Sequence, residues 1–400
     1  MPLRWLRDAW LIAGLTAVLL VSFNTVLLAL LPDLEAANRI DPAVTERPAR
    51  DRADCYHDAR WGKELFREQK KSKRVRWQPY VHWQRQPFRG EYINIDENGR
   101  RVTQNPSGTE SPRVFVFGGS TVWGTGVRDA YTIPSLLSGA LEEIGRPAHV
   151  TNFGETGYVS TQALIALVRE LQAHNVPEFV VFYDGANDVF AAVQEGAAGL
   201  PQNEQERRRE FRVVGGSPLR LLLAAFWKLE GLHAAVAWLR GDVEGTETPA
   251  RYRALADEIV ATYAANVRTV AALAREWDFE ALFYWQPTSF TRRALTAYER
   301  RATGWQLSRH RDLQLVTNRS LRTNEALAAI PAFHDVSALL DDVAEPMFID
   351  FCHLGERANG LVAARIAVDV ARALRERAAK RAAGGPRSKK AASVKGAPIR

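Results

Sequence analysis

The 400-residue sequence predicts an α/β protein in which helices cover both faces of a parallel sheet and one membrane-spanning helix precedes them. Between residues 112 and 375, short apolar runs alternate with helical stretches, and the runs end in glycine or polar residues. Residues 114–117 and 179–183 are two such runs, uncharged and rich in Val and Phe, as is typical of buried parallel strands. The second observation is an uncharged stretch of 23 residues, 9–31, which is long enough to cross a bilayer.

The flanks of this apolar stretch predict its orientation. Arg4 and Arg7 precede it, whereas Asp33 and Glu35 follow it, so the positive-inside rule places the N-terminus in the cytoplasm and the bulk of the chain outside. The stretch ends in Leu-Leu-Pro-Asp without a small-residue cleavage site, which favours an uncleaved anchor over a signal peptide. In a bacterium the anchor would lie in the inner membrane and the domain in the periplasm or outside the cell. A buried core helix is the alternative interpretation.

The formal net charge of +7 comes from the C-terminal end of the chain. Residues 375–400 hold nine Lys or Arg and one Glu, a net +8, which leaves about −1 for the remainder. Such a segment cannot bury a core and predicts a solvated disordered tail, with contact to an anionic surface as the alternative. No nucleic-acid-binding signature accompanies it, so specific nucleic-acid binding is not expected.

A strand followed by a tight turn presents the first candidate site residue. The apolar run 114–117 ends in Gly118 and Gly119, which permit a sharp turn, and then in Ser120. Open α/β sheets bind their ligands at the carboxyl ends of the strands. Ser120 is therefore a candidate nucleophile.

The partners that a nucleophilic serine needs lie further along the chain. Asp350 and His353 are three residues apart just before the last predicted helix, so the carboxylate can orient the imidazole and the imidazole can accept the serine proton. A helix entry with a solvated histidine is the alternative for this pair. Asn187 follows the run 179–183 and offers an amide donor for an oxyanion, or it is an ordinary turn residue.

A glycine after the run 149–151 supplies a further donor, because a backbone N–H without a neighbouring Cβ can approach a substrate oxygen closely. Gly154 and Gly157 are the two candidates, and a strand-to-helix turn is the simpler reading of both. Polar loops thus follow four strand candidates in turn.

Together these blocks resemble the SGNH, or GDSL-type, hydrolase superfamily over roughly residues 112–375. The family has a serine block, a glycine, a Gly-x-Asn-Asp block and an Asp-x-x-His block. The matching positions here are Ser120, Gly157, Asn187, Asp350 and His353. Gly157 is preferred over Gly154 because a helix follows it, as in the family. The serine block departs from the family pattern, since it reads Gly-Gly-Ser-Thr and Gly119 stands where the family has an acidic residue.

The resemblance implies a flavodoxin-like three-layer α/β/α sandwich and a serine esterase acting on an acyl or acetyl ester. Ser120, His353 and Asp350 would be catalytic, and Ser120, Gly157 and Asn187 would form the oxyanion hole. An O-acetyltransferase acting on a cell-envelope polysaccharide is one alternative, and a non-catalytic envelope binding protein is another. No cofactor or metal is expected, because the sequence lacks phosphate-binding glycine motifs and zinc-ligand spacing.

The predicted domain organisation follows from these segments. Within the hydrolase domain, residues 61–112 read as a β extension with an Asn98-Gly99 turn, and residues 190–250 read as a helical insertion. Leu219–Trp238 is strongly apolar and follows the Asn187 loop, so it is either a lid over the site or a packed helix. The segments are 1–8, a cytoplasmic N-terminus; 9–31, an anchor; 32–60, a linker; 61–375, the hydrolase domain; and 376–400, a basic tail.

The two cysteines do not indicate whether the protein resides in an oxidising or a reducing compartment. Cys55 lies in the predicted linker and Cys352 lies inside the Asp-x-x-His block. A disulfide and two inert thiols are both compatible with this count.

Overall fold

The computed structural model describes residues 2–30, 38–56, 59–105, 111–214 and 248–382. Its centre is a five-stranded sheet in which every pairing is parallel. The strands lie in the order β6-β5-β7-β8-β9. Counted along the chain this is the 2-1-3-4-5 order of flavodoxin-like folds, so the predicted fold class is confirmed. The strands are β5 (Arg113–Gly118), β6 (His149–Gly154), β7 (Phe179–Asp184), β8 (Glu280–Trp285) and β9 (Phe333–Asp335).

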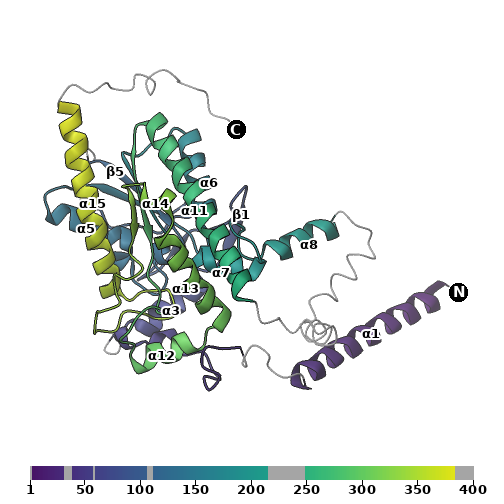
Figure 1. Ribbon diagram of the computed structural model, residues 1–400. Coiled ribbons are helices and arrows are strands. Elements are labelled where there is room, and N and C mark those ends of the chain that lie inside the picture. The colour runs from purple at the N-terminus through teal and green to yellow at the C-terminus, as the bar shows by residue number, and fades with distance from the viewer. Residues whose placement is uncertain (1, 31–37, 57–58, 106–110, 215–247, 383–400) are drawn as a thin grey trace.

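Helices cover both faces of this sheet (Figure 1). Because side chains alternate along a strand, Val114 and Val116 of β5 pack in one core, whereas Phe115 and Phe117 pack in the other. The first core is covered by α5 (Ile133–Glu143) and α15 (Glu356–Ala382). The second is covered by α6 (Ser160–Gln172), α7 (Ala186–Glu195), α11 (Pro249–Trp277) and α13 (Ser308–Arg322).

The starts of these helices follow from local sequence signals. Thr132 precedes α5 and its hydroxyl accepts a hydrogen bond from the Ser135 backbone N–H, with Pro134 in the first turn. Thr248 caps α11 in the same way. The remaining helices are α1 (Pro2–Leu30), α3 (Gly62–Lys71), α4 (Ser120–Trp123), α8 (Glu204–Val214), α12 (Ala297–Gly304) and α14 (Glu325–Ala328), with short 3-10 turns at Arg50–Arg52, Asp54–Tyr56 and Asp129–Tyr131.

The predicted anchor lies on α1. Residues Arg7–Leu27 of this helix are long and apolar enough to cross a membrane, judged by length and composition. None of this window is buried against the rest of the protein. An exposed apolar helix of this length is able to span the hydrocarbon core of a bilayer.

The segment predicted as a linker, residues 32–60, is packed in its described part. Ala53 and Tyr56 are buried in a cluster with Tyr298, Ala302 and Ile349. The Tyr56 hydroxyl also donates a hydrogen bond to the Gly126 carbonyl oxygen. Residues 38–56 therefore belong to the folded domain, and the prediction of a linker was wrong for them. The charged, proline-containing composition of the segment gave no sign of this packing.

The β extension at 61–112 contains two small antiparallel pairs, as expected, but a helix precedes them. The pairs are β1 (Val75–Gln78) with β2 (His82–Arg85) and β3 (Phe88–Arg89) with β4 (Asn94–Ile95). Helix α3 was not expected because its sequence is mostly charged and it buries only a narrow face that includes Leu65. The predicted turn at Asn98-Gly99 is present, and Gly99 has a φ of 79°.

Two other predicted segments are only partly described. Helix α8 occupies part of the predicted insertion at 190–250, whereas the lid candidate Leu219–Trp238 lies outside the described residues. The basic tail was predicted from residue 376, but α15 continues to Ala382. On that helix Arg377 forms an ion pair with Asp278 at 3.1 Å, so the tail begins later than predicted.

Candidate functional site

Ser120 is the first residue of the short helix α4, directly after β5 and Gly119. Strand β5 lies between β6 and β7, where the chain order of the sheet reverses. In open α/β sheets such a switch point opens a crevice at the carboxyl ends of the strands. The structure therefore places the Ser120 hydroxyl at the edge of the sheet where a substrate can reach it.

Asp350 and His353 meet Ser120 from the loop between β9 and α15. The His353 Nε2 atom lies 2.7 Å from the Ser120 Oγ atom. On its other side, the His353 Nδ1 atom lies 2.9 and 2.8 Å from the two Asp350 carboxylate oxygens. The Asp350 Oδ1 atom also accepts from the backbone N–H groups of Cys352 and His353, at 3.1 and 2.8 Å. This chain of contacts can carry a proton from the hydroxyl to the imidazole.

Two arginines that sequence reasoning missed also reach Asp350. The Arg50 Nη2 atom lies 2.5 Å from Asp350 Oδ2, and the Arg47 Nη2 atom lies 3.7 Å from it. Burial alone would raise the pKa of the Asp350 carboxyl, but the nearby His353 and Arg50 charges overcome it and hold that pKa well below its usual value. Asp350 therefore stays ionised and can orient the imidazole. No sequence motif marked these arginines, because they lie in the segment expected to be a linker.

Three donors surround the serine. The Asn187 side-chain nitrogen donates to the Tyr158 carbonyl oxygen at 2.9 Å, which leaves its second N–H free for another acceptor. Gly157 has a φ of 82°, a conformation that favours glycine, and lies in the same pocket as Ser120 and Asn187. Within the described part of the chain, the backbone N–H groups of Ser120 and Gly157 donate to no protein acceptor. These three groups can accept a developing negative charge.

Gly119 lies directly against the Asn187 side chain. A Cβ atom on residue 119 would overlap the Asn187 side-chain nitrogen. With Asn187 in this position, a side chain at residue 119 would require the Asn187 amide to move.

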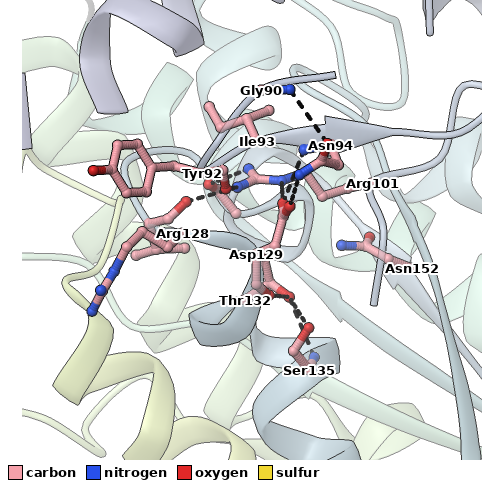
Figure 2. A network of polar contacts seen from close by, with 12 residues as sticks. Gly90, Tyr92, Ile93, Asn94, Arg101, Arg128, Asp129, Thr132, Ser135 and Asn152 are labelled. Carbon is pink, nitrogen blue, oxygen red and sulfur yellow. Dashed lines mark hydrogen bonds and ion pairs between the residues drawn. The ribbon is translucent and has the colours of Figure 1, made fainter. Parts of the chain in front are cut away.

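A buried network supports α4 and the loop after it (Figure 2). The Arg101 guanidinium contacts Asp129 at 2.5 Å and donates to the carbonyl oxygens of Gly124, Val127 and Tyr92 at 3.0, 2.8 and 3.2 Å. The Arg101 side chain is fully buried. These bonds hold in place the residues that directly follow α4.

Trp123, the last residue of α4, lies between two cations. The guanidinium carbons of Arg85 and Arg101 are each 4.7 Å from the centroid of its ring. Such contacts contribute about 0.5–2 kcal/mol each, with the larger value applying to desolvated pairs. Both arginines come from the β extension, so that segment helps to hold Ser120 in place.

The pocket at Ser120 has a volume of about 340 Å³ and a mixed lining. Phe190, Trp305 and Phe351 provide apolar surface, and the rings of Phe190 and Phe351 stack with centroids 6.1 Å apart. Neutral polar residues also line the pocket, and its basic side chains are Arg47, Arg50, Lys73 and Arg85. A larger cavity of about 700 Å³ lies between the β1–β2 pair and α6, but its lining does not include Ser120 or His353.

The cysteines are both free thiols in this structure, so the disulfide that the sequence left open is not formed. Burial raises the pKa of the Cys55 thiol to about 12 and that of Cys352 well above its usual value, with the Asp350 charge adding to the second shift. Asp350, Cys352 and His353 come close enough to ligate a metal. However, His353 and Asp350 are already engaged with Ser120 and with Arg50.

Comparisons with known proteins find structural likeness only. No family model and no curated protein matches the chain. A member of the lipolytic G-D-S-L family from Veillonella parvula is 13% identical, with 64% of this chain and 97% of that chain covered and a TM-score of 0.34. A catalytic mutant of an acetylxylan esterase from Geobacillus stearothermophilus is 11% identical, with coverages of 63% and 90% and a TM-score of 0.36. A lipase/acylhydrolase from Enterococcus faecalis is 13% identical, with coverages of 65% and 95% and a TM-score of 0.29.

Of the five residues predicted from the sequence, Ser120, Gly157, Asn187 and His353 line one pocket, and Asp350 lies behind it in contact with His353. Asp350 is part of the site although it does not directly follow a strand, since β9 ends at Asp335. A bridge between Phe348 and Leu354 closes the loop that carries it. This bridge, which the sequence did not reveal, turns Asp350 and His353 toward Ser120.

Proposed function

We propose that this chain is a membrane-anchored serine ester hydrolase of the SGNH, or GDSL-type, superfamily. The observation that carries the proposal is the continuous contact from Ser120 through His353 to Asp350. Its support is independent of any likeness to other proteins, because a nucleophile, a base and an orienting carboxylate are what acyl transfer requires.

In the proposed reaction the Ser120 oxygen attacks the ester carbonyl carbon while His353 takes the hydroxyl proton. The tetrahedral oxyanion is held by the backbone N–H groups of Ser120 and Gly157 and by the Asn187 amide. When it collapses, the alcohol leaves with the proton from His353 and an acyl-Ser120 intermediate remains. Water then attacks the intermediate with His353 as base, and the carboxylic acid is released. Asp350 stabilises the imidazolium that forms in each half of the reaction.

The direct test is hydrolysis of nitrophenyl acetate and butyrate by purified protein. We expect Ser120→Ala and His353→Ala each to lower kcat by several orders of magnitude, about 10³- to 10⁶-fold, because the residues act as a unit. Ser320→Ala serves as the control, since its hydroxyl contacts Asp257 on exposed helix surface. Folded Ser120→Ala protein with near-wild-type turnover would rule out the proposal.

Asn187→Ala tests the oxyanion hole separately. Loss of one donor typically costs about 10²- to 10³-fold in kcat. Since the amide also touches Tyr158, circular dichroism of the variant must match that of the wild type. An unchanged kcat would remove Asn187 from the proposed mechanism.

The proposal also assigns α1 as an anchor with a cytoplasmic N-terminus and an exported catalytic domain. It is supported by the apolar window Arg7–Leu27 and by Arg4 and Arg7 on the N-terminal side. A periplasmic reporter fused after residue 60 should be active and remain with the membrane fraction. A soluble product cleaved near residue 35 would show instead that α1 is a signal peptide.

A further inference from the structure

The lining of the pocket at Ser120 is unusually rich in positive charge. Arg47, Arg50, Lys73 and Arg85 all line it, and no Asp or Glu does so among the described residues. Behind the wall, Asp350 pairs with Arg50 and Glu155 pairs with Arg85 at 3.5 Å. Two carboxylates thus offset two of four cations, which leaves an excess of about two positive charges at the pocket.

The uncompensated cations are Arg47 and Lys73. Arg47 shares Asp350 with the closer Arg50, and its side chain is 48% exposed. Lys73 is exposed and has no ion pair within the described part of the chain. Burial, followed by the neighbouring Arg50 charge, lowers the pKa of the Arg47 guanidinium. An anion bound beside Arg47 would relieve this repulsion between like charges.

The positive surface continues beyond the serine. An adjoining hollow of about 390 Å³ shares Arg47, Arg50 and Lys73 with the pocket and adds Lys70, with Asp51 as its one acidic residue among those described. The two hollows therefore adjoin each other across these shared basic residues, next to the end of α3. A cleft lined by one sign of charge raises the local concentration of the opposite charge.

We propose that the substrate is an ester of an anionic compound, one that carries a carboxylate, sulfate or phosphate group close to the scissile acyl bond. Arg47 and Lys73 bind that group and determine specificity, whereas Arg50 and Arg85 are held by Asp350 and Glu155. The inference rests on the proposed esterase function and adds the substrate class to it. An acylated acidic sugar or a half-ester of a dicarboxylic acid has this chemistry.

The experiment compares two pairs of esters in which one neutral end group is replaced by a carboxylate. The first pair, nitrophenyl butyrate and nitrophenyl hemisuccinate, places the charge on the acyl portion. The second pair, an O-acetylated glucoside and the matching glucuronide, places it on the sugar. We expect kcat/KM to favour the anionic member of at least one pair by roughly tenfold, because opposite charges steer association. The preference should shrink between about 0.01 M and about 1 M salt, where the Debye length falls from about 30 Å to about 3 Å.

Charge changes at Lys73 and Arg47 locate the binding groups. Lys73→Glu and Arg47→Gln should each reduce the preference for the anionic ester roughly threefold or more, as expected for one partly exposed ion pair. Lys71→Glu is the matched control, because Lys71 is exposed at the end of α3, two residues before Lys73, but lines neither hollow. Lys71→Glu should cleave all four esters at near-wild-type rates and keep the wild-type preference.

The outcomes separate the two proposals. Cleavage of both members of each pair at equal rates, or a preference that Lys73→Glu leaves unchanged, would overturn the anionic substrate and leave the esterase intact. If the wild-type protein cleaves none of the four esters, the esterase proposal fails and this inference fails with it.

Discussion

Two arginine–aspartate pairs near Ser120 differ in what surrounds them. Arg101 meets Asp129 and Arg50 meets Asp350, each at 2.5 Å, and both arginines precede β5 in the chain. Arg101 is fully buried and satisfies three backbone carbonyl groups as well. Arg50 is 26% exposed and lines the pocket. The first pair holds the scaffold, whereas the second involves the carboxylate that contacts His353, the proposed catalytic base.

Of the changes considered for these pairs, substitution of Arg101 should have the largest effect, and that effect is on stability. We expect Arg101→Met to lower the free energy of unfolding by about 3–5 kcal/mol, because it leaves Asp129 without its cation in a dry site. Its neighbour provides the control, since Arg100 pairs with Glu170 on a partly exposed surface. Arg100→Met should cost no more than about 1 kcal/mol. Urea denaturation measures both, and equal losses would show that burial does not distinguish the two arginines.

Arg50 should affect turnover more than stability. Without its cation, Asp350 holds the protonated imidazole more tightly, so Arg50→Gln should lower kcat roughly tenfold, or about 1.4 kcal/mol in activation free energy. The acidic limb of the kcat/KM profile should move to higher pH at the same time. Arg52→Gln is the control, since Arg52 is exposed on the same 3-10 turn.

One result for Arg50 would show that the two arginine–aspartate pairs do not differ in role. If Arg50→Gln lowers the melting temperature but leaves kcat and the pH profile unchanged, the contact is structural. Arg50 and Arg101 would then have the same role.

A third aspartate, Asp184, has no cationic partner among the described residues, so its effect should appear as a pH dependence of stability. Both carboxylate oxygens of Asp184 are buried without a hydrogen-bond partner among the described residues, and burial, reinforced by the Asp188 charge, raises the pKa of Asp184 well above its usual value. The folded state then keeps a proton that the unfolded chain loses above about pH 4, so stability falls as pH rises beyond that value.

Asp184→Asn removes this titration. Between pH 5 and pH 8 the unfolding free energy of the variant should therefore decline less than that of the wild type, by up to about 1.4 kcal/mol per pH unit. Asp312→Asn is the control, because the Asp312 side chain is 43% exposed and pairs with Arg311. Parallel stability curves for wild type and Asp184→Asn would contradict the assignment.

The sequence predicts the sheet and marks the candidate residues Ser120, Asp350 and His353 because both depend on short local patterns. The run 114–117 with its glycines defines β5 and Ser120, and the Asp-x-x-His spacing defines the pair at Asp350 and His353. Local patterns do not reveal partners that are distant in sequence. Arg50 reaches Asp350 across 300 residues, and nothing in its own surroundings marks it as part of a site.

The same limit explains the misread N-terminal segments. Charged composition predicted a linker at 32–60, but burial of Tyr56 against Tyr298 depends on a surface formed much later in the chain. Likewise, the close approach of Gly119 to the Asn187 amide depends on how the fold brings the two residues together. Composition describes a segment alone, whereas packing depends on what the fold brings beside it.

The most direct test of the account is covalent labelling of the full chain with a fluorophosphonate. In this reaction the activated serine oxygen displaces fluoride from phosphorus, so the probe reports the nucleophile itself. Peptide mass spectrometry should find one adduct, on Ser120, that is absent in Ser120→Ala and unaffected in Ser320→Ala. Labelling should slow roughly tenfold in Arg50→Gln, in step with its kcat. An adduct on another residue, or undiminished labelling of Ser120→Ala, would contradict the assignment of Ser120 as the nucleophile.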